Sequence, residues 1–313
     1  MDSDTSFNTK SSAGQSPSIL VVIVLHEAAE WVEFCLAPLV GAEFLDIVCV
    51  DNASSDETVS KLLKDFPSIT LICSEENLGF GRANNLGIDN SLRDNHQHIF
   101  LLNQDARIAP EAILELAEIQ SNNPSFGVVS PLHFTRTEED LDPLFSSYLS
   151  SDVTPQLLSD LLLRKTPAPV YATKFVNAAL WLISSDCLSR VGVFDPRFPH
   201  YSEDDDYVRR VRIAGFLVGI CPGVMAEHVR GYGSGGRTAQ FYRSAESRSY
   251  SNALLKMKYG NRGRATQFLD VLRAGAIDFF KSTLHVDPRG AAVSLRVTWR
   301  LVCFLLRESN KGA

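Results

Sequence analysis

Segments with strand character alternate with segments of helical spacing four times in the first 120 residues of this 313-residue chain. Apolar runs predict strands at 19–25, 45–50, 69–73 and 98–102. The segments with helical spacing are 30–40, 58–66, 84–92 and 110–120. A crossover helix lets the next strand run parallel to the last, so this alternation is typical of α/β proteins. We therefore expect a doubly wound, Rossmann-like sheet of mostly parallel strands.

The remainder of the chain is less regular. Residues 138–169 contain four prolines, which predict a variable loop. Apolar or helical spacing resumes at 174–183, 207–213 and 217–221, and three further helical stretches follow at 239–259, 265–284 and 291–307. We expect a disordered polar tail at 1–17, an α/β domain at 18–230, and a C-terminal extension at 231–313 made of a glycine-rich loop and basic helices.

Charge is divided unevenly between these parts. The chain has a net charge of −7, but residues 1–228 carry −17 and residues 229–313 carry +10. Such asymmetry indicates different partners for the two parts. A hydrophobic share of 45% with 21% charged residues excludes a wholly disordered chain.

Several features indicate where the protein works. The aliphatic run at 19–25 is too short to span a membrane, which takes about 20 residues. Residues 1–17 lack the apolar core of a signal peptide, so we expect a cytoplasmic protein, with peripheral contact to the inner face of the cell membrane left open. The six cysteines form no CxxC pair, which favours buried thiols over a zinc site or disulfides.

Polar residues follow three of the predicted strands at the point where each strand ends. They are His26-Glu27, the segment 51–56, and Asn103-Gln104-Asp105. Ligands of doubly wound sheets bind beyond the carboxyl ends of the strands, so we expect these clusters to form one site. Asp51 can accept hydrogen bonds from a base or ribose, and Asn52 can both donate and accept.

Five short motifs resemble those of family 2 glycosyltransferases with the GT-A fold. They are VDNASSDET at 50–58, ENLGFGRANNLGI at 76–88, LLNQDA at 101–106, GVFDPRF at 192–198 followed by YSEDDD at 201–206, and AEH at 226–228. The rhamnosyltransferase-like enzymes of bacterial polysaccharide biosynthesis are the most similar subgroup. The resemblance implies a GT-A catalytic domain at 18–230. It also implies an inverting glycosyltransferase that moves a sugar from a UDP-, dTDP- or GDP-linked donor to a saccharide or lipid-linked glycan acceptor.

The resemblance also implies a metal site. Residues 103–105 stand where the family carries an Asp-x-Asp motif, so Asp105 is the expected carboxylate ligand and His228 matches a position that often completes the site. A divalent cation would offset the repulsion between a diphosphate and this acidic domain. Mg²⁺ or Mn²⁺ prefers oxygen ligands, and substrate phosphates commonly supply some of them. Asn103 departs from the first Asp and can offer a neutral oxygen or hold the sugar.

Four carboxylates at 203–206 precede a predicted helix. Acid placement at a helix N-terminus explains Asp205 and Asp206. Crowded carboxylates raise one another's pKa, which suits a general base. By resemblance, Asp204 deprotonates the acceptor hydroxyl with Glu203 beside it, in an in-line displacement with inversion.

Donor and acceptor contacts follow from the same resemblance. The expected donor-binding residues are Asp51, Asn52, Asn77, Gly79, Arg82, Asn103, Gln104 and Arg243. Glycine permits close backbone approach to a ligand, and Arg82 either reaches the nucleotide or has an exposed structural role. The family's Thr-Tyr-Asn is replaced by Leu25-His26-Glu27, which leaves the base open. Trp181 either stacks on the acceptor sugar or belongs to the core.

The basic C-terminal part admits several partners. A glycine-hinged loop at 231–236 with Arg243 can close over the diphosphate, and the alternative is an ordinary solvated face. The last helix interleaves Arg296 and Arg300 with apolar residues. That pattern suits an anionic membrane, the catalytic domain, or a second subunit in a homo-oligomer. We expect no nucleic-acid partner, because no recognition motif accompanies the charge.

Two other functions remain as hypotheses. A catalytically degenerate GT-A domain would bind a nucleotide-sugar or glycan without turnover, and the departures at Asn103 and at 25–27 favour it. The retained Asp105, His228 and 203–204 carboxylates favour an enzyme. A nucleotidyltransferase has less support, because no lysine- and glycine-rich loop follows the first strand.

Overall fold

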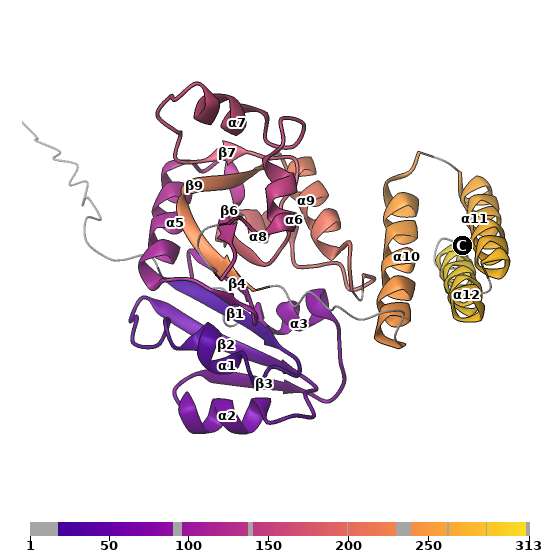
Figure 1. Ribbon diagram of the computed structural model, residues 1–313, viewed down its shortest axis with the longest axis horizontal. Coiled ribbons are helices and arrows are strands. Elements are labelled where there is room, and N and C mark those ends of the chain that lie inside the picture. The colour runs from indigo at the N-terminus through magenta and orange to yellow at the C-terminus, as the bar shows by residue number, and fades with distance from the viewer. Residues whose placement is uncertain are drawn as a thin grey trace, which may run out of the picture.

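An α/β domain built on one nine-stranded sheet precedes three long helices (Figure 1). The computed structural model describes residues 18–89, 96–136, 140–198, 200–229, 239–261, 263–285 and 287–310. The expected tail at 1–17 and the glycine-rich loop at 231–236 lie outside these ranges, as does the side chain of Arg243.

The first half of the sheet is parallel, as the sequence predicts. Its strands are β1 (Ile19–Leu25), β2 (Leu45–Asn52), β3 (Thr70–Ser74) and β4 (His98–Asn103), in the spatial order β3-β2-β1-β4. The side chains of β1 are buried apart from the partly buried Val24, because helices cover both faces of the sheet. All four strands end at the same edge, which carries the polar clusters of β1, β2 and β4.

Helices cover the two faces of this sheet. One apolar cluster joins β1 to α1 (Val32–Leu36), α2 (Thr58–Asp65) and α5 (Pro110–Asn122). The other joins it to α3 (Phe80–Gly87), α8 (Ser185–Val191) and α9 (Glu203–Ile213). The helix α1 is shorter than the expected 30–40, because Pro38 cannot continue it.

The helix α3 begins at Phe80 and ends at Gly87, whereas the sequence predicts 84–92. Gly79 precedes it with φ of 78°, a conformation that favours glycine. A Cβ on Gly87 would lie 2.3 Å from Cγ1 of Val22, so only glycine lets the helix pack this closely on β1.

The second half of the sheet is mixed. The strand β8 (Leu180–Ser184) runs antiparallel between β4 and β6 (Phe126–Phe134), and β6 pairs in parallel with β9 (Leu217–His228). The short strands β5 (Ala106–Arg107) and β7 (Tyr171–Ala172) are antiparallel to β9. The strand β9 extends seven residues beyond the predicted 217–221 after a register shift against β6 at Pro131/Leu132.

The segment at 138–169 is more ordered than a variable loop. It contains α6 (Pro143–Ser146), a 3-10 helix at Ser147–Leu149, and α7 (Pro155–Leu162). Two of the prolines open these helices, where proline is tolerated because the first N–H has no partner within the helix.

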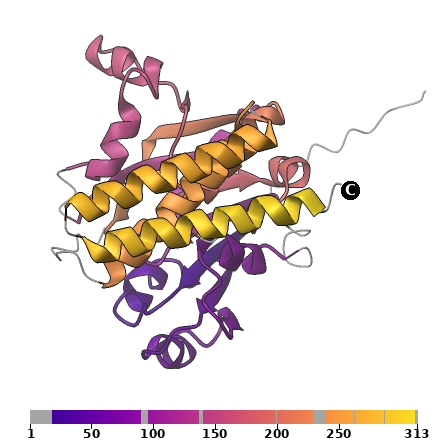
Figure 2. The same cartoon turned by 90° about the vertical axis from the view of Figure 1, so that its right-hand side faces the viewer.

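The C-terminal helices agree closely with their predicted ranges. They are α10 (Ala239–Tyr259), α11 (Arg264–Leu284) and α12 (Pro288–Asn310). The helix α10 lies between the α/β domain and α11–α12 (Figure 1), and Figure 2 shows α11 and α12 side by side. Phe198 joins their apolar cluster from the α/β domain. None of the helices within the described ranges has the length and apolar character needed to cross a membrane.

The close packing of α3 on β1 leads to a stability prediction. We expect Gly87→Ala to lower the free energy of unfolding by about 1–3 kcal/mol, because Val22 is fully buried and cannot retreat from the new methyl group. Gly223→Ala is the matched control, since its Cβ would meet only Glu115 Oε1 at 3.9 Å. Denaturant unfolding of both variants measures the difference, and equal stability would contradict this account of the packing.

Candidate active site

A cavity of about 550 Å³ opens at the carboxyl edge of the parallel strands. It is lined by Val24, His26, Asn52, Asn77, Leu78, Gly79, Phe80, Arg82, Asn103, Gln104, Asp105, His200, Ser244 and Ser247. The three polar clusters therefore meet at one site, together with the loop before α3. Ser244 and Ser247 come from α10, so the C-terminal extension supplies part of the wall.

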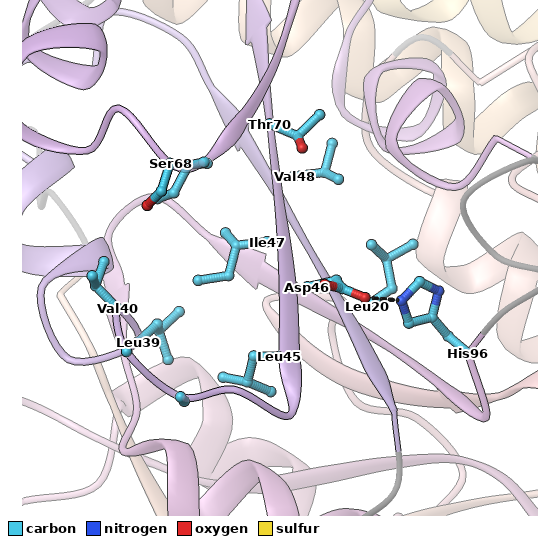
Figure 3. A pocket seen from close by; sticks show the side chains of 13 residues that line it. Leu20, Leu39, Val40, Leu45, Asp46, Ile47, Val48, Ser68, Thr70 and His96 are labelled. Atoms are coloured by element: carbon cyan, nitrogen blue, oxygen red, sulfur yellow. Dashed lines mark hydrogen bonds and ion pairs between the residues drawn. The ribbon is translucent and has the colours of Figure 1, made fainter.

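Another pocket, of about 360 Å³, lies near the amino ends of β1 and β2 (Figure 3). Its lining is mostly aliphatic, and its polar pair is His96 Nε2 and Asp46 Oδ2 at 2.7 Å. The Asp46 side chain is 71% exposed. Because ligands of such sheets bind at the opposite edge, the cavity at the carboxyl ends is the stronger candidate for the active site.

Gln104 ties the end of β4 to the end of β1. Its Oε1 accepts a hydrogen bond from the backbone N–H of His26 at 2.8 Å, and its Nε2 donates to the His26 carbonyl at 3.2 Å. The oxygen and the nitrogen of the Gln104 side-chain amide therefore both have hydrogen-bond partners within the protein. Gln104 lines the cavity, as expected of a donor-binding residue, while its hydrogen bonds hold the His26 backbone.

Asn52 and Asn77 shape the loop that precedes α3. Asn52 Nδ2 donates to Asn77 Oδ1 at 3.1 Å, and Asn52 Oδ1 accepts from the Leu78 N–H at 2.8 Å. Asn77 Oδ1 also accepts from the Gly79 N–H at 2.9 Å. These bonds fix the backbone of Leu78 and Gly79 at the cavity wall.

Asp51 and Arg82 flank this loop in different environments. Asp51 is 4% exposed and lies behind the cavity lining, where its Oδ2 accepts from the Ser54 N–H at 3.3 Å. Its Oδ1 is buried without a hydrogen-bond partner, so an acceptor is available there. Arg82 lines the cavity, and its Nε–H donates to the Leu78 carbonyl at 2.8 Å.

The predicted metal ligands Asp105 and His228 lie together at one side of the cavity. His228 Nε2 is 3.5 Å from Asp105 Oδ1. The pairing of β5 with β9 brings them together, because His228 is opposite Ala106, the residue after Asp105. The Val229 N–H also donates to the Asp105 carbonyl at 2.8 Å, which fixes the backbone there.

The surroundings of this pair add oxygen atoms. Asn103 Oδ1 is buried without a hydrogen-bond partner. Asp142 Oδ2 lies 3.8 Å from His228 Nδ1, while Asp142 Oδ1 caps α6 by accepting from the Phe145 N–H at 2.7 Å. Sequence analysis missed Asp142 as a neighbour of His228, because Asp before Pro143 indicates only a helix cap.

The side chains around Asp105 and His228 can be compared with the ligands that a metal ion needs. Over the described ranges, no group of three or more His, Cys, Asp or Glu side chains could hold a metal ion. The available set is one carboxylate, one imidazole and the unpartnered amide oxygen of Asn103. That set fits a hard divalent cation whose remaining ligands come from substrate phosphates and water.

Glu203 and Asp204 begin α9 beside the cavity. Glu203 is 7% exposed, its Oε2 has no hydrogen-bond partner, and its Cβ lies 3.5 Å from the position of a Cβ on Gly81, next to Arg82. Burial and the adjacent Asp204 raise the pKa of Glu203. Burial and Asp205 raise the pKa of Asp204, although Asp204 Oδ1 accepts from the Asp205 N–H at 2.9 Å. Elevated pKa values suit a group that accepts a proton near neutral pH.

The turn before α9 is held by α10. Tyr201 and Ser202 have φ of 67° and 62°, left-handed values that cost free energy in residues other than glycine. Ser202 Oγ donates to Asn252 Oδ1 at 2.8 Å. The Arg248 guanidinium lies 4.5 Å from the Tyr201 ring centroid, a cation–π contact.

Asp206 is the centre of a buried ionic network in this region. It is fully buried and accepts from Arg210 Nε at 2.8 Å, Lys258 Nζ at 2.5 Å and the Tyr259 hydroxyl at 2.8 Å. Lys258 Nζ also donates to Asp195 Oδ2 at 2.6 Å. Burial opposes ionisation of Asp195, but hydrogen bonds from Arg197 and Lys258 hold its pKa well below its ordinary range. The network joins α10 to the first turn of α9.

Trp181 corrects one prediction. Its side chain is fully buried at the centre of β8, with its ring 6.3 Å from that of Phe194 and 5.8 Å from that of Tyr207. The strand β8 lies inside the sheet between β4 and β6, and this face is covered by α8 and α9. Trp181 is therefore a core residue, and the stacking role toward the acceptor is wrong.

Comparison with known proteins identifies the family. The sequence profile of glycosyl transferase family 2 matches residues 20–176, which is half of the chain. The chain therefore belongs to glycosyl transferase family 2. This confirms the resemblance drawn from the five sequence motifs.

Curated relatives lie among rhamnosyltransferases. The chain is 24% identical over 185 residues to dTDP-rhamnosyl transferase RfbF of Shigella flexneri, covering 59% of this chain and 60% of that relative. It is 27% identical over 243 residues to N-acetylglucosaminyl-diphospho-decaprenol L-rhamnosyltransferase of Mycobacterium tuberculosis, covering 69% of this chain and 77% of the relative. The match to RfbF thus spans less than two thirds of its length.

Solved structures confirm the GT-A fold. One is a mannosyltransferase, PcManGT of Pyrobaculum calidifontis, in complex with GDP-Man and Mn²⁺. It superposes with a TM-score of 0.56 at 18% identity, and the match covers 95% of this chain and 80% of the mannosyltransferase chain. GalNAc-T7 with UDP, GalNAc and Mn²⁺ gives a TM-score of 0.55 at 16% identity. That match covers 74% of this chain and 47% of the GalNAc-T7 chain. At these identities the likeness concerns the fold alone.

The ionic network leads to a second stability prediction. We expect Lys258→Met to lower the free energy of unfolding by about 3 kcal/mol, because it removes a cation from two carboxylates, one of which is fully buried. Lys256→Met, on the exposed side of the same helix, should change it by less than about 0.5 kcal/mol. Denaturant unfolding measures the free energy of unfolding of both variants. A loss for Lys258→Met as small as that of the control would show that the network contributes little to stability.

The raised pKa of Glu203 gives a prediction about pH. A carboxyl group whose pKa is higher in the folded than in the unfolded chain stabilises the fold below its unfolded pKa of about 4.3. That stabilisation is lost as the pH rises through the folded pKa. We therefore expect Glu203→Gln, which cannot ionise, to become more stable relative to the unmutated chain as the pH rises.

Denaturant unfolding at several pH values, from about pH 5 to about pH 8, measures this difference. Glu75→Gln, at an exposed residue, is the control and should show no such trend. A stability difference between Glu203→Gln and the unmutated chain that stays constant with pH would mean that Glu203 ionises as an ordinary carboxyl group.

Proposed function

We propose that this protein is an inverting glycosyltransferase. It moves a sugar from a nucleotide-sugar donor, linked to UDP, dTDP or GDP, to a saccharide or lipid-linked glycan acceptor. The observation that carries this proposal is the cavity at the carboxyl edge of the sheet. Its lining combines the donor-motif residues with Asp105, and the Cβ of Glu203 packs beside Gly81, between the lining residues Phe80 and Arg82. Membership of glycosyl transferase family 2 supports the same reaction.

The sugar to test first is rhamnose. Two curated relatives are named as rhamnosyltransferases, one of them using a dTDP-linked donor and the other acting on a diphospho-decaprenol lipid. We therefore propose a dTDP-linked deoxyhexose as the donor and a saccharide or polyprenyl-diphosphate-linked glycan as the acceptor. We also propose that transfer to a lipid-linked acceptor would take place at the cytoplasmic face of the membrane.

We propose that a divalent cation, Mg²⁺ or Mn²⁺, is the cofactor. Asp105 and His228 would hold it, with the Asn103 oxygen as a neutral third group. When bound, such a cation supplies positive charge that stabilises the diphosphate leaving group. Two of the similar solved structures contain Mn²⁺, which supports this assignment.

The residues of the chain have separate roles in the proposed reaction. Asp51 offers its unpartnered oxygen to the base or ribose, and the Asn77–Gly79 loop lies against the nucleotide. Arg82 lies at the cavity wall, where its guanidinium can pair with the diphosphate. The side chain of Arg243 lies outside the described residues and remains a proposed phosphate contact.

The carboxylates of α9 provide the base. We propose that Asp204, whose pKa is raised by burial and by Asp205, accepts the proton of the acceptor hydroxyl, with Glu203 beside it. The hydroxyl oxygen forms a bond to the anomeric carbon on the face opposite the nucleotide. The bond from that carbon to the diphosphate oxygen breaks, and the diphosphate leaves with the electron pair.

A binding domain without catalysis is the second candidate. Asn103 in place of a first carboxylate ligand and His26-Glu27 at the end of β1 favour it. It would bind the nucleotide-sugar and give no turnover with any acceptor. The two functions therefore differ in turnover and not in donor affinity.

Asp204→Asn separates the two functions. We expect kcat for sugar transfer, or for donor hydrolysis, to fall at least about 100-fold, because proton transfer by a positioned base contributes that much. Donor affinity, measured by thermal shift with a panel of nucleoside diphosphate sugars and Mn²⁺ or Mg²⁺, should change less than about twofold. Asp186→Asn, an exposed carboxylate on α8, is the control. Donor binding without turnover in the unmutated chain would instead support the binding domain.

A further inference from the structure

The hairpin of α11 and α12 carries a broad apolar surface on its solvent side, which we call the outer face. It comprises Leu269, Leu272, Ile277, Phe280 and Leu284 of α11 with Leu295, Trp299 and Leu306 of α12. Their exposed fractions range from 39% at Leu272 to 81% at Leu284. Single exposed apolar residues are ordinary, whereas eight large ones on one side of a helical hairpin indicate an interaction surface.

Helix geometry explains why these side chains share one side. In α12 the buried residues Val293, Val297, Leu301 and Leu305 recur every four positions. At about 100° per residue, Leu295, Trp299 and Leu306 fall on the opposite side of that helix.

The same holds for α11, where Asp270, Ala274 and Asp278 line a groove between α10 and α11. Leu269 and Phe280 project from the other side of the helix. The two apolar stripes therefore point away from α10. Figure 2 shows the two helices side by side at the front of the molecule, so the outer face is turned away from the sheet.

Basic side chains are more numerous than acidic ones around the outer face. Exposed basic residues of the two helices are Arg273, Lys281, Arg289, Arg296 and Arg300. Arg273 lies within the apolar stripe of α11, and Arg296 and Arg300 flank that of α12 while also reaching Glu246 of α10.

The acidic side chains described in this hairpin lie at the border of the outer face or away from it. Asp270 and Asp278 line the groove on the α10 side. Asp287 caps α12, where its Oδ1 accepts from the Gly290 N–H at 2.9 Å. Asp270 is seven residues before Ile277 and therefore borders the stripe of α11, so the outer face is apolar with an excess of basic side chains around it.

We propose that the outer face docks on an anionic lipid bilayer, with the hairpin lying in the plane of the interface. The apolar side chains enter the boundary of the acyl chains, and the basic side chains meet the lipid phosphates. A second copy of this chain fits less well. A two-fold interface would bring the same excess of basic side chains together, because Asp270 is the one carboxylate among the described residues of the hairpin that borders the outer face. The proposal depends on the outer face alone and not on the transfer reaction.

Flotation of the full-length protein with lipid vesicles tests the proposal. We expect binding to vesicles of equal phosphatidylglycerol and phosphatidylethanolamine, and much weaker binding to phosphatidylcholine alone. The triple variant Phe280→Ser/Leu284→Ser/Trp299→Ser should reduce the vesicle-bound fraction at least about tenfold. The matched control is Leu63→Ser/Leu162→Ser/Leu163→Ser, which removes side chains exposed by 59%, 74% and 67% on the α/β domain. The control should bind like the unmutated chain.

The basic residues are tested in the same assay. Arg273→Gln/Lys281→Gln should weaken binding to the anionic vesicles severalfold relative to the unmutated chain. Added salt screens the charges, so it should remove most of this difference between the two proteins. The proposal is overturned if the unmutated chain does not float, or if the triple variant floats equally well. It is also overturned if light scattering finds a dimer that the triple variant dissociates while neither protein binds vesicles.

Discussion

The parallel pairing of β1 with β2 and β4 is the interaction on which the candidate site depends. Leu25 at the end of β1 is opposite Asp51 of β2, and Val24 is opposite Asn103 of β4. This register makes the strands end together, so three polar segments that are far apart in the sequence share one edge. The hydrogen bonds of Gln104 and Asn52 then hold the chain beyond those ends. A shift of one residue would turn Asp51 and Asn103 toward the opposite faces.

Local patterns predicted the parts of the fold that depend on local chemistry. The four parallel strands and three C-terminal helices follow from apolar runs and helical spacing, and the shared polar edge follows from the polar clusters at the strand ends. Long-range contacts were beyond such patterns. Asp206 and Lys258 are 52 residues apart, and nothing in either segment specifies that they pair. Trp181 was ambiguous for the same reason, since an aromatic residue in a strand fits a core and a binding surface equally well.

The position of His228 shows how topology and local sequence combine. Its place in the family motif suggested a ligand, but only the length of β9 explains how it reaches Asp105. The register shift at Pro131/Leu132 lets β9 continue past the end predicted from its apolar run. The strand then pairs with β5, and His228 arrives 3.5 Å from the carboxylate. A two-residue strand therefore determines whether the proposed metal ligands meet.

The helix α10 belongs to two parts of the molecule at once. Ser244 and Ser247 form part of the cavity wall, whereas Tyr250, Leu254 and Leu255 belong to the apolar core of the C-terminal helices. A fragment cut before α10 would lack part of the wall of its own cavity and would also lack Lys258, one of the two cations that pair with Asp206. The smallest self-sufficient unit of this protein is therefore larger than its α/β domain. The helix α10 is thus a structural part of the candidate site, although it lies beyond the α/β domain in the sequence.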